Sequence, residues 1–178
     1  VKGEEVEEPM DSSKKNFMSI PDQHKFLIQL IFPNQNNSEN QLSLSELDQK
    51  FILSKMSMLP RHSTNPKYGA KYYDGYCKFF MFGDSKARIP DHIKIFNKVG
   101  LAYGFVLDNA YIIDQKHGVE FFLTAVVYGN RNGVLNDNIY DYDNLTIPFL
   151  SVLGNAIYKY EKMREKKHAP DLSFFEQM

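Results

Sequence analysis

The sequence between residues 93 and 105 reads Ile93-Lys94-Ile95-Phe96-Asn97-Lys98-Val99-Gly100-Leu101-Ala102-Tyr103-Gly104-Phe105. Most of this run is apolar or β-branched, which is typical of a strand within a sheet. It also contains Lys98 and Gly100. An unpaired ammonium is costly to bury, and a glycine inside a strand often marks the close approach of a ligand or of another backbone. The run therefore predicts a strand edge that lines an anion-binding cleft.

Two interpretations of this strand remain open. In the first, Lys98 offers a fixed positive charge to a carboxylate, Gly100 lets a substrate lie against the strand, and the Leu101 N–H points at a developing oxyanion. In the second, Lys98 only extends from a sheet edge into water, and Gly100 marks a β-bulge. The first interpretation makes Lys98, Gly100 and Leu101 the candidate catalytic residues.

The segments that follow predict an antiparallel β-meander with a helix packed on it. Strands are expected over residues 93–99, 104–113 and 119–128, and a Lys116-His117-Gly118 turn joins the last two. A final helix is expected over residues 147–164. An apolar face on the third strand would receive this helix: Phe121, Leu123, Ala125 and Val127. The expected fold class is α+β.

The residues before the meander are expected to add helices to the same single domain. Residues 1–18 are predicted to be a polar linker, and residues 19–178 a single α+β domain. One helix should begin at a Ser19 cap and end before Pro33. A second should begin at a capping box formed by Ser43 and Glu46, and end near Pro60. The aromatic segment 72–82 fits a short helix slightly better than a strand.

Composition excludes several classes of protein. The chain has 178 residues, is 43% hydrophobic and has a formal net charge of −1. These values suit one globular domain and argue against a nucleic-acid partner. No apolar run is long enough to span a bilayer. The only cysteine, Cys77, cannot form an internal disulfide.

Several motifs together resemble the C-terminal half of the serine hydrolases related to class A β-lactamases and penicillin-binding proteins. The resemblance is greatest to the Bacteroidetes branch and covers roughly residues 17 to 175. The motifs lie on both sides of the lysine-glycine strand: Met58-Leu59-Pro60-Arg61, Tyr73-Asp74-Gly75-Tyr76, Phe82-Gly83-Asp84, Phe96-Asn97-Lys98-Val99-Gly100, Ala102-Tyr103-Gly104, Asp108, Ala110-Tyr111-Ile112, Val119-Glu120-Phe121-Phe122-Leu123 and Pro148-Phe149-Leu150.

The resemblance implies roles for the strand residues. In these families a lysine-threonine/serine-glycine triplet borders the active site, where the lysine attracts a substrate carboxylate and the glycine keeps the cleft open. Lys98 and Gly100 match that triplet. Val99 stands in place of the hydroxyl residue, which removes one hydrogen bond to the carboxylate. The implied substrate is a small molecule or peptide that bears a carboxylate and is cleaved at an amide or ester.

The nucleophile of such an enzyme is a serine followed by a lysine three residues later on a helix. Ser12 and Lys15 have this spacing, but Ser19 and Pro21 separate them from the first expected helix. Ser38-Glu39-Asn40 is similar to the second family motif, yet it lies in an asparagine-rich loop. We interpret both matches as chance. The chain is thus expected to be the C-terminal part of a longer hydrolase, inactive alone, with the N-terminal half of the same protein as its partner and an exported or periplasmic location.

The remaining polar residues give weaker hypotheses. Cys77 with His62, His92 or Asp74 could form a thiol hydrolase, although a lone cysteine beside aromatic residues more often has a packing role. The histidines show no metal-ligand spacing in sequence: His24, His62, His92, His117 and His168.

Oxygen-rich side chains occur in one loop, at Asn136-Asp137-Asn138, Asp141 and Asp143, without the register of a calcium loop. No metal or cofactor is therefore expected. Two further functions stay open beside the hydrolase: a non-catalytic module of the same fold that recognises a peptide or cell-wall carboxylate, and a structural domain without a ligand.

Overall fold

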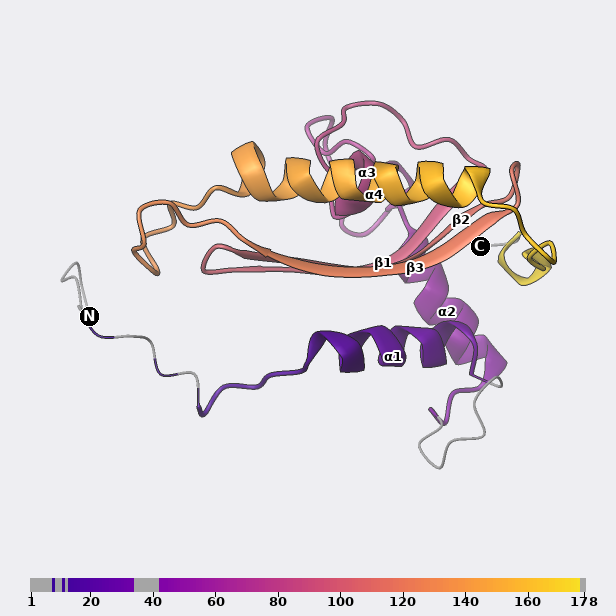
Figure 1. Ribbon diagram of the computed structural model, residues 1–178, viewed down its shortest axis with the longest axis horizontal. Helices are drawn as coiled ribbons and strands as arrows, with labels where there is room; N and C mark the ends of the chain where they lie inside the picture. Colours follow the sequence, from indigo (N-terminus) through magenta and orange to yellow (C-terminus); the bar gives the residue numbers. More distant parts are fainter. Residues whose placement is uncertain (1–7, 9–10, 12, 34–41, 177–178) are drawn as a thin grey trace.

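The computed structural model describes residues 8, 11, 13–33 and 42–176. A three-stranded antiparallel sheet lies between two layers of helices, so the fold is α+β as predicted (Figure 1). The helices are α1 (Ile20–Ile31), α2 (Glu46–Ser57), α3 (Phe79–Phe82) and α4 (Ile147–Met163), and the strands are β1 (Ile93–Ala102), β2 (Phe105–Asp114) and β3 (Val119–Tyr128). Helix α4 covers one face of the sheet, and α1 runs under the other. In the described part of the chain, no helix is both long and apolar enough to cross a bilayer.

The sheet has the order β1-β2-β3, so the predicted meander is confirmed. Strand β1 extends three residues past the predicted end and pairs Ala102 with Phe105. Only Tyr103 and Gly104 connect these two residues, and both have positive φ angles, of 51° and 87°. A two-residue turn of this kind matches the twist of its strands. The hairpin leaves β1 at the edge of the sheet.

Helix α4 packs on the apolar face of β3, as the alternating residues predicted. Leu150, Leu153 and Ile157 of α4 share one hydrophobic cluster with Phe121 and Leu123 of β3. On the opposite face, Leu27 and Leu30 of α1 and Leu53 of α2 form a second cluster with Phe96 and Tyr111. Strand β2 sends alternate residues into both clusters, which explains its nearly continuous apolar run.

The start of α1 agrees with prediction, whereas the capping box of α2 does not. Ser19 caps α1 by accepting a hydrogen bond from the Asp22 N–H at 3.2 Å. In α2 the capping box is formed by Ser45 and Asp48, not by Ser43 and Glu46. The Asp48 N–H donates to Ser45 Oγ at 3.1 Å, and the Ser45 N–H donates to Asp48 Oδ2 at 3.2 Å. A short aspartate therefore closes the box two residues further along.

The short helix favoured within residues 72–82 is confirmed only at the end of the segment, as α3. Residues 72–78 form turns and irregular backbone, and α3 is a single short element in which Phe80 and Met81 have non-helical angles. The backbone N–H groups of Phe79 and Phe80 donate to Oδ2 of Asp108 at 3.0 and 3.1 Å. This buried carboxylate takes the hydrogen bonds that a helix would otherwise make, so a tertiary contact overrides the local pattern.

Candidate functional site

Lys98 lies on β1 near its hairpin end and is exposed. Its Nζ donates a hydrogen bond to the carbonyl oxygen of its neighbour Val99 at 2.7 Å. No carboxylate among the described residues forms an ion pair with it. By strand alternation it lies on the face of Phe96, the face that packs against α1 and α2, but its own side chain is exposed. The ammonium is thus accessible to an anion from solvent.

Gly100 lies beside it and has open space around it. A Cβ added there would meet only the side chain of Leu107, at 3.8 Å, which is an ordinary contact. Packing within the described residues therefore does not require glycine at this position. The half-exposed position leaves room for another molecule against the strand.

The register shows where the Leu101 N–H points. In a two-residue hairpin the pair next to the turn, here Ala102 and Phe105, exchanges both hydrogen bonds, and such pairs alternate along the strands. The hydrogen bond from the Gln115 N–H to the His92 carbonyl, at 2.9 Å, fits the same alternation. Leu101 is therefore a position whose N–H points away from β2, toward the open edge of β1. The strand brings the three predicted site residues together at this edge.

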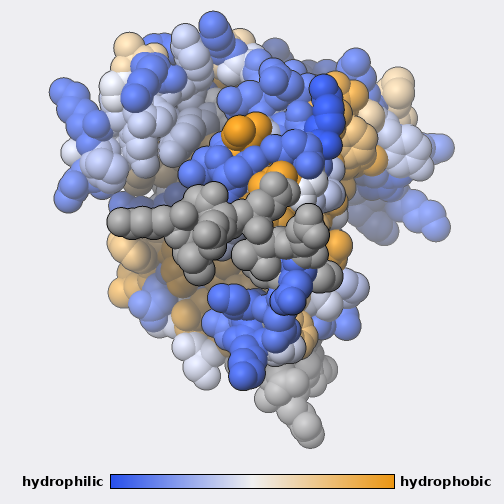
Figure 2. Space-filling view, turned by 90° about the vertical axis from the view of Figure 1, so that its left-hand side faces the viewer, coloured by the Kyte–Doolittle hydropathy of each residue, from blue (hydrophilic) through white to orange (hydrophobic). Residues whose placement is uncertain are grey.

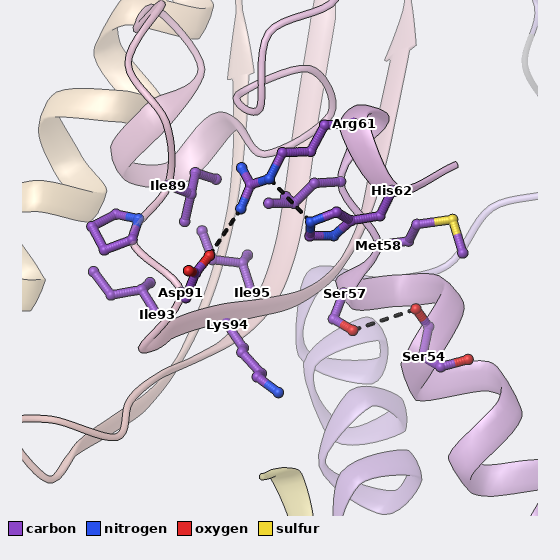
Figure 3. A pocket seen from close by; sticks show the side chains of 12 residues that line it. Ser54, Ser57, Met58, Arg61, His62, Ile89, Asp91, Ile93, Lys94 and Ile95 are labelled. Carbon is purple, nitrogen blue, oxygen red and sulfur yellow. Dashed lines mark hydrogen bonds and ion pairs between the residues drawn. The ribbon is translucent and has the colours of Figure 1, made fainter. Parts of the chain in front are cut away.

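A cavity of about 180 Å³ lies further along the same edge, at the start of β1 (Figure 3). The end of α2, the turn Pro60–His62 and the segment 89–91 surround it. The Arg61 guanidinium pairs with Asp74 and with Asp91, the latter at 3.1 Å. The Lys94 side chain extends away from the cavity, and its Nζ donates to the Phe175 carbonyl at 3.0 Å. The cavity thus offers apolar walls and compensated charges.

Among the described residues that line this cavity, no nucleophile is paired with a base. Ser57 donates its hydroxyl to the Ser54 carbonyl at 3.4 Å, and the Arg61 Nε donates to His62 Nε2 at 3.0 Å. Neither serine hydrogen-bonds to the histidine among the described contacts. The cavity can hold a small apolar group but lacks the pairing needed for covalent catalysis.

A buried polar network lies behind the strand edge. Lys78 donates from Nζ to the Met56 carbonyl at 2.5 Å and to Asn97 Oδ1 at 2.6 Å. Asn97 in turn donates to Asp108 Oδ1 at 2.8 Å and to the Cys77 carbonyl at 2.9 Å. Burial lowers the pKa of Lys78 to about 8 and raises that of Asp108 to about 6, the latter against hydrogen bonds from Asn97 and the backbone. The network anchors residues 77–80 to the sheet.

The structure does not support a thiol hydrolase. Burial raises the pKa of the Cys77 thiol, which disfavours the reactive thiolate. Its supposed partners are engaged elsewhere. Asp74 accepts from the Ile89 N–H at 2.9 Å and pairs with Arg61, and His92 contacts Asp114 at 2.9 Å.

The end of the sheet opposite the hairpin holds a cluster that the sequence did not reveal. Asp114 is fully buried at the end of β2, and its two oxygens lie 2.9 Å from His92 Nδ1 and 2.7 Å from His117 Nδ1. The Tyr158 hydroxyl of α4 donates to the same carboxylate at 2.6 Å. Burial would raise the pKa of Asp114, but the hydrogen bonds from Tyr158, His117 and His92 outweigh it and hold the pKa at about 2.

A sequence signal for this cluster did exist. Asp114 and His117 are three residues apart across the β2–β3 turn, and pairing Ile93 with Asp114 places His92 next to them. His92 and His117 are 25 positions apart in the sequence, so their proximity was not apparent until the register was known.

The remaining candidates are easily placed. Carboxylates of the loop before α4 accept from nearby backbone: Asp137 from the Ile139 N–H at 2.8 Å, and Asp141 from the Arg131 N–H at 2.8 Å. This fits a surface turn. Ser12 and the Ser38-Glu39-Asn40 motif lie outside the described residues.

Comparisons with protein-family models, with curated proteins and with solved structures find no match to this chain.

Proposed function

We propose that residues 19–178 are the C-terminal, sheet-and-helix part of a β-lactamase-like serine hydrolase that acts on an amide or ester. What supports the proposal is the arrangement at the hairpin end of β1: the ammonium of Lys98, which pairs with no carboxylate of the described residues, the open space at Gly100, and the outward N–H of Leu101. The nucleophile is supplied from outside the 178 residues, by the N-terminal half of the same protein.

Each residue has one role in this proposal. The Lys98 ammonium attracts the substrate carboxylate, and the strand at Gly100 lets the substrate lie parallel to β1. The Leu101 N–H donates to the oxygen that becomes negative when the carbonyl is attacked. Because Val99 has no hydroxyl, carboxylate binding rests on Lys98 alone among the triplet side chains.

A non-catalytic binding module is the second candidate. It is favoured by the serine contacts, since no serine hydroxyl of the described residues hydrogen-bonds to a lysine or histidine. Ser151, for example, donates to Asp84 at 2.5 Å. A module of this kind would keep carboxylate recognition by Lys98 and lack turnover.

A titration followed by NMR tests the carboxylate site that both candidates share. We expect N-acetyl-D-alanine to shift the backbone amide resonances of Val99, Gly100 and Leu101 in the full chain, and its uncharged amide to shift them far less. Lys98→Ala should remove the response, whereas Lys159→Ala, at an exposed position of α4, should keep it. Equal shifts from acid and amide, or an unchanged response in Lys98→Ala, would overturn the assignment.

Chemistry separates the two candidates. A fluorophosphonate phosphonylates an activated serine, whose oxygen bonds to phosphorus as fluoride leaves, so the hydrolase reacts with it and the binding module does not.

A further inference from the structure

The geometry points to a divalent transition-metal site, best suited to zinc, formed by His92, Asp114 and His117. This site lies at the end of the sheet away from Lys98 and does not depend on the proposed hydrolase. Two imidazoles and one carboxylate form a donor set that zinc commonly takes, with a further position left for water.

The donor atoms are already close together. One ligand atom of each residue lies within 4.8 Å of the others. The Nδ1 atoms of His92 and His117 lie 2.9 and 2.7 Å from the oxygens of Asp114. With metal–ligand bonds of about 2.0–2.1 Å, the ligands of a tetrahedral zinc ion lie roughly 3.3 Å apart. An ion between these residues would need only small side-chain rotations.

The carboxylate is held in place by groups that do not compete for the ion. Tyr158 donates to Oδ2 of Asp114 at 2.6 Å, and the His117 backbone N–H donates to Oδ1 at 3.1 Å. Partners of this kind orient a ligand and strengthen metal binding. They also mean that Asp114, which is fully buried, keeps hydrogen bonds when the imidazoles turn from it to a metal.

The two imidazoles can change tautomer without losing a partner. Each Nδ1 that faces a carboxylate oxygen carries a proton, whereas coordination through Nδ1 requires that proton to move to Nε2. The His92 and His117 side chains are 33% and 32% exposed, so an Nε2–H can reach water. The ring centroids lie 5.8 Å apart at an angle of 76°, so the rings are not stacked on each other.

A bound ion would connect three parts of the fold. His92 precedes β1, Asp114 ends β2 and His117 lies in the β2–β3 turn, while Tyr158 connects the cluster to α4. Binding to the folded chain should therefore raise its melting temperature in proportion to the logarithm of the metal concentration.

Binding of zinc to the full, tag-free chain tests the inference. Isothermal titration calorimetry with zinc chloride should give one site, and His92→Gln or His117→Gln should weaken it at least about 100-fold. Tyr158→Phe should weaken it about tenfold, since it only orients the carboxylate. His168→Gln changes an exposed histidine outside the cluster and should leave the affinity unchanged.

Spectroscopy identifies the ligands independently of stability. Cobalt(II) should give visible d–d bands in the unmodified chain, and ¹⁵N NMR should show the Nδ1 resonances of both histidines shifting on addition of zinc. The metal site would be overturned by an absence of stoichiometric binding, by shifts at Nε2 alone, or by an equal loss of affinity in His168→Gln. The role of the cluster would then be to hold the β2–β3 turn in place through hydrogen bonds.

Discussion

Asp108 shows how one residue fixes a segment whose own sequence is ambiguous. Its carboxylate accepts two backbone N–H groups from residues 79 and 80 and one hydrogen bond from Asn97. An unpaired buried carboxylate would be costly, but here each oxygen is satisfied. The same carboxylate carries a raised pKa of about 6 because it is buried.

We predict that this raised pKa makes part of the stability depend on pH. An unfolded aspartate has a pKa of about 3.9, so between about pH 4 and pH 6 the folded chain holds a proton that the unfolded chain has lost. The contribution of Asp108 is complete below that window and is lost as the pH rises through it, by about 3 kcal/mol at most. Urea unfolding of the unmodified chain and of Asp108→Asn, at pH 4 and pH 7, measures this.

In the difference between the unmodified chain and Asp108→Asn, the pH dependence that arises from all other groups, including the histidines, cancels. As the pH rises from 4 to 7, the unfolding free energy of the unmodified chain should fall relative to that of Asp108→Asn. A difference that stays constant over this range would show that the carboxylate has an ordinary pKa.

Lys98 should matter little for folding. Its side chain is exposed and forms no ion pair among the described residues, so Lys98→Ala should change the unfolding free energy by no more than about 0.5 kcal/mol. Chemical denaturation checks this, with Lys78→Ala for comparison. Because Lys78 is buried and donates two hydrogen bonds, its loss should cost several times more. A large loss with Lys98→Ala would favour a packing role.

At the scale of elements, the start of α2 is decided by one capping box. Ser45→Ala should lower the unfolding free energy by about 1 kcal/mol because the Asp48 N–H loses its acceptor and the hydrogen bond from the Ser45 hydroxyl to Asp48 is lost. Ser43→Ala is the matched control, since Ser43 is exposed and lies two residues before the cap. Thermal unfolding of both variants measures the effect. If Ser45→Ala and Ser43→Ala lowered the unfolding free energy equally, this result would contradict the capping box at Ser45 and favour the one predicted at Ser43 and Glu46.

Helix α4 reaches the short α3 through a glycine. A Cβ on Gly154 would lie 2.6 Å from the Met81 backbone nitrogen and 2.8 Å from the Phe80 Cβ. Gly154→Ala should therefore destabilise the fold by about 1–3 kcal/mol, although alanine favours helices.

Val152→Ala provides the control for that prediction, because Val152 is 66% exposed on the same helix. It should change the unfolding free energy by no more than about 0.5 kcal/mol in urea denaturation. If Gly154→Ala stabilised the chain, as helix propensity alone would have it, α3 and α4 would have to be further apart than described.

Sequence reasoning succeeded where a pattern is local. Alternation at Phe121 and Leu123 predicted the face of β3, and Ser19 with Pro21 predicted the start of α1. It was right only for the end of the segment 72–82, because the hydrogen bonds of Phe79 and Phe80 go to a carboxylate almost 30 positions away. No periodicity within the segment carries that information.

At the scale of the whole molecule, the helices cover the sheet unevenly. The end of the sheet at the β1–β2 hairpin exposes large apolar side chains, including Phe105 at 50% and Tyr128 at 49%. Figure 2 faces this side of the molecule, and hydrophobic surface lies there among hydrophilic residues. In the proposed hydrolase, the N-terminal half of the protein would lie against this end.

One candidate site could be predicted from neighbouring residues, whereas the other depends on residues that are far apart in the sequence. Lys98, Gly100 and Leu101 are neighbours in sequence, so their common place on a strand edge could be predicted. His92, Asp114 and His117 come together only because β1 and β2 pair in one register. Their chemistry could not be predicted from spacing, since a register shift of one residue would separate them.

The most direct test of the hydrolase uses the protein as its own cells produce it. The purified protein is treated with a fluorophosphonate, and mass spectrometry of its peptides locates the adduct. The account predicts one labelled serine outside residues 1–178 and no labelling of the isolated 178-residue chain by the fluorophosphonate or by a fluorescent penicillin. An unlabelled native protein, or an adduct on a serine within these residues such as Ser12, would contradict it.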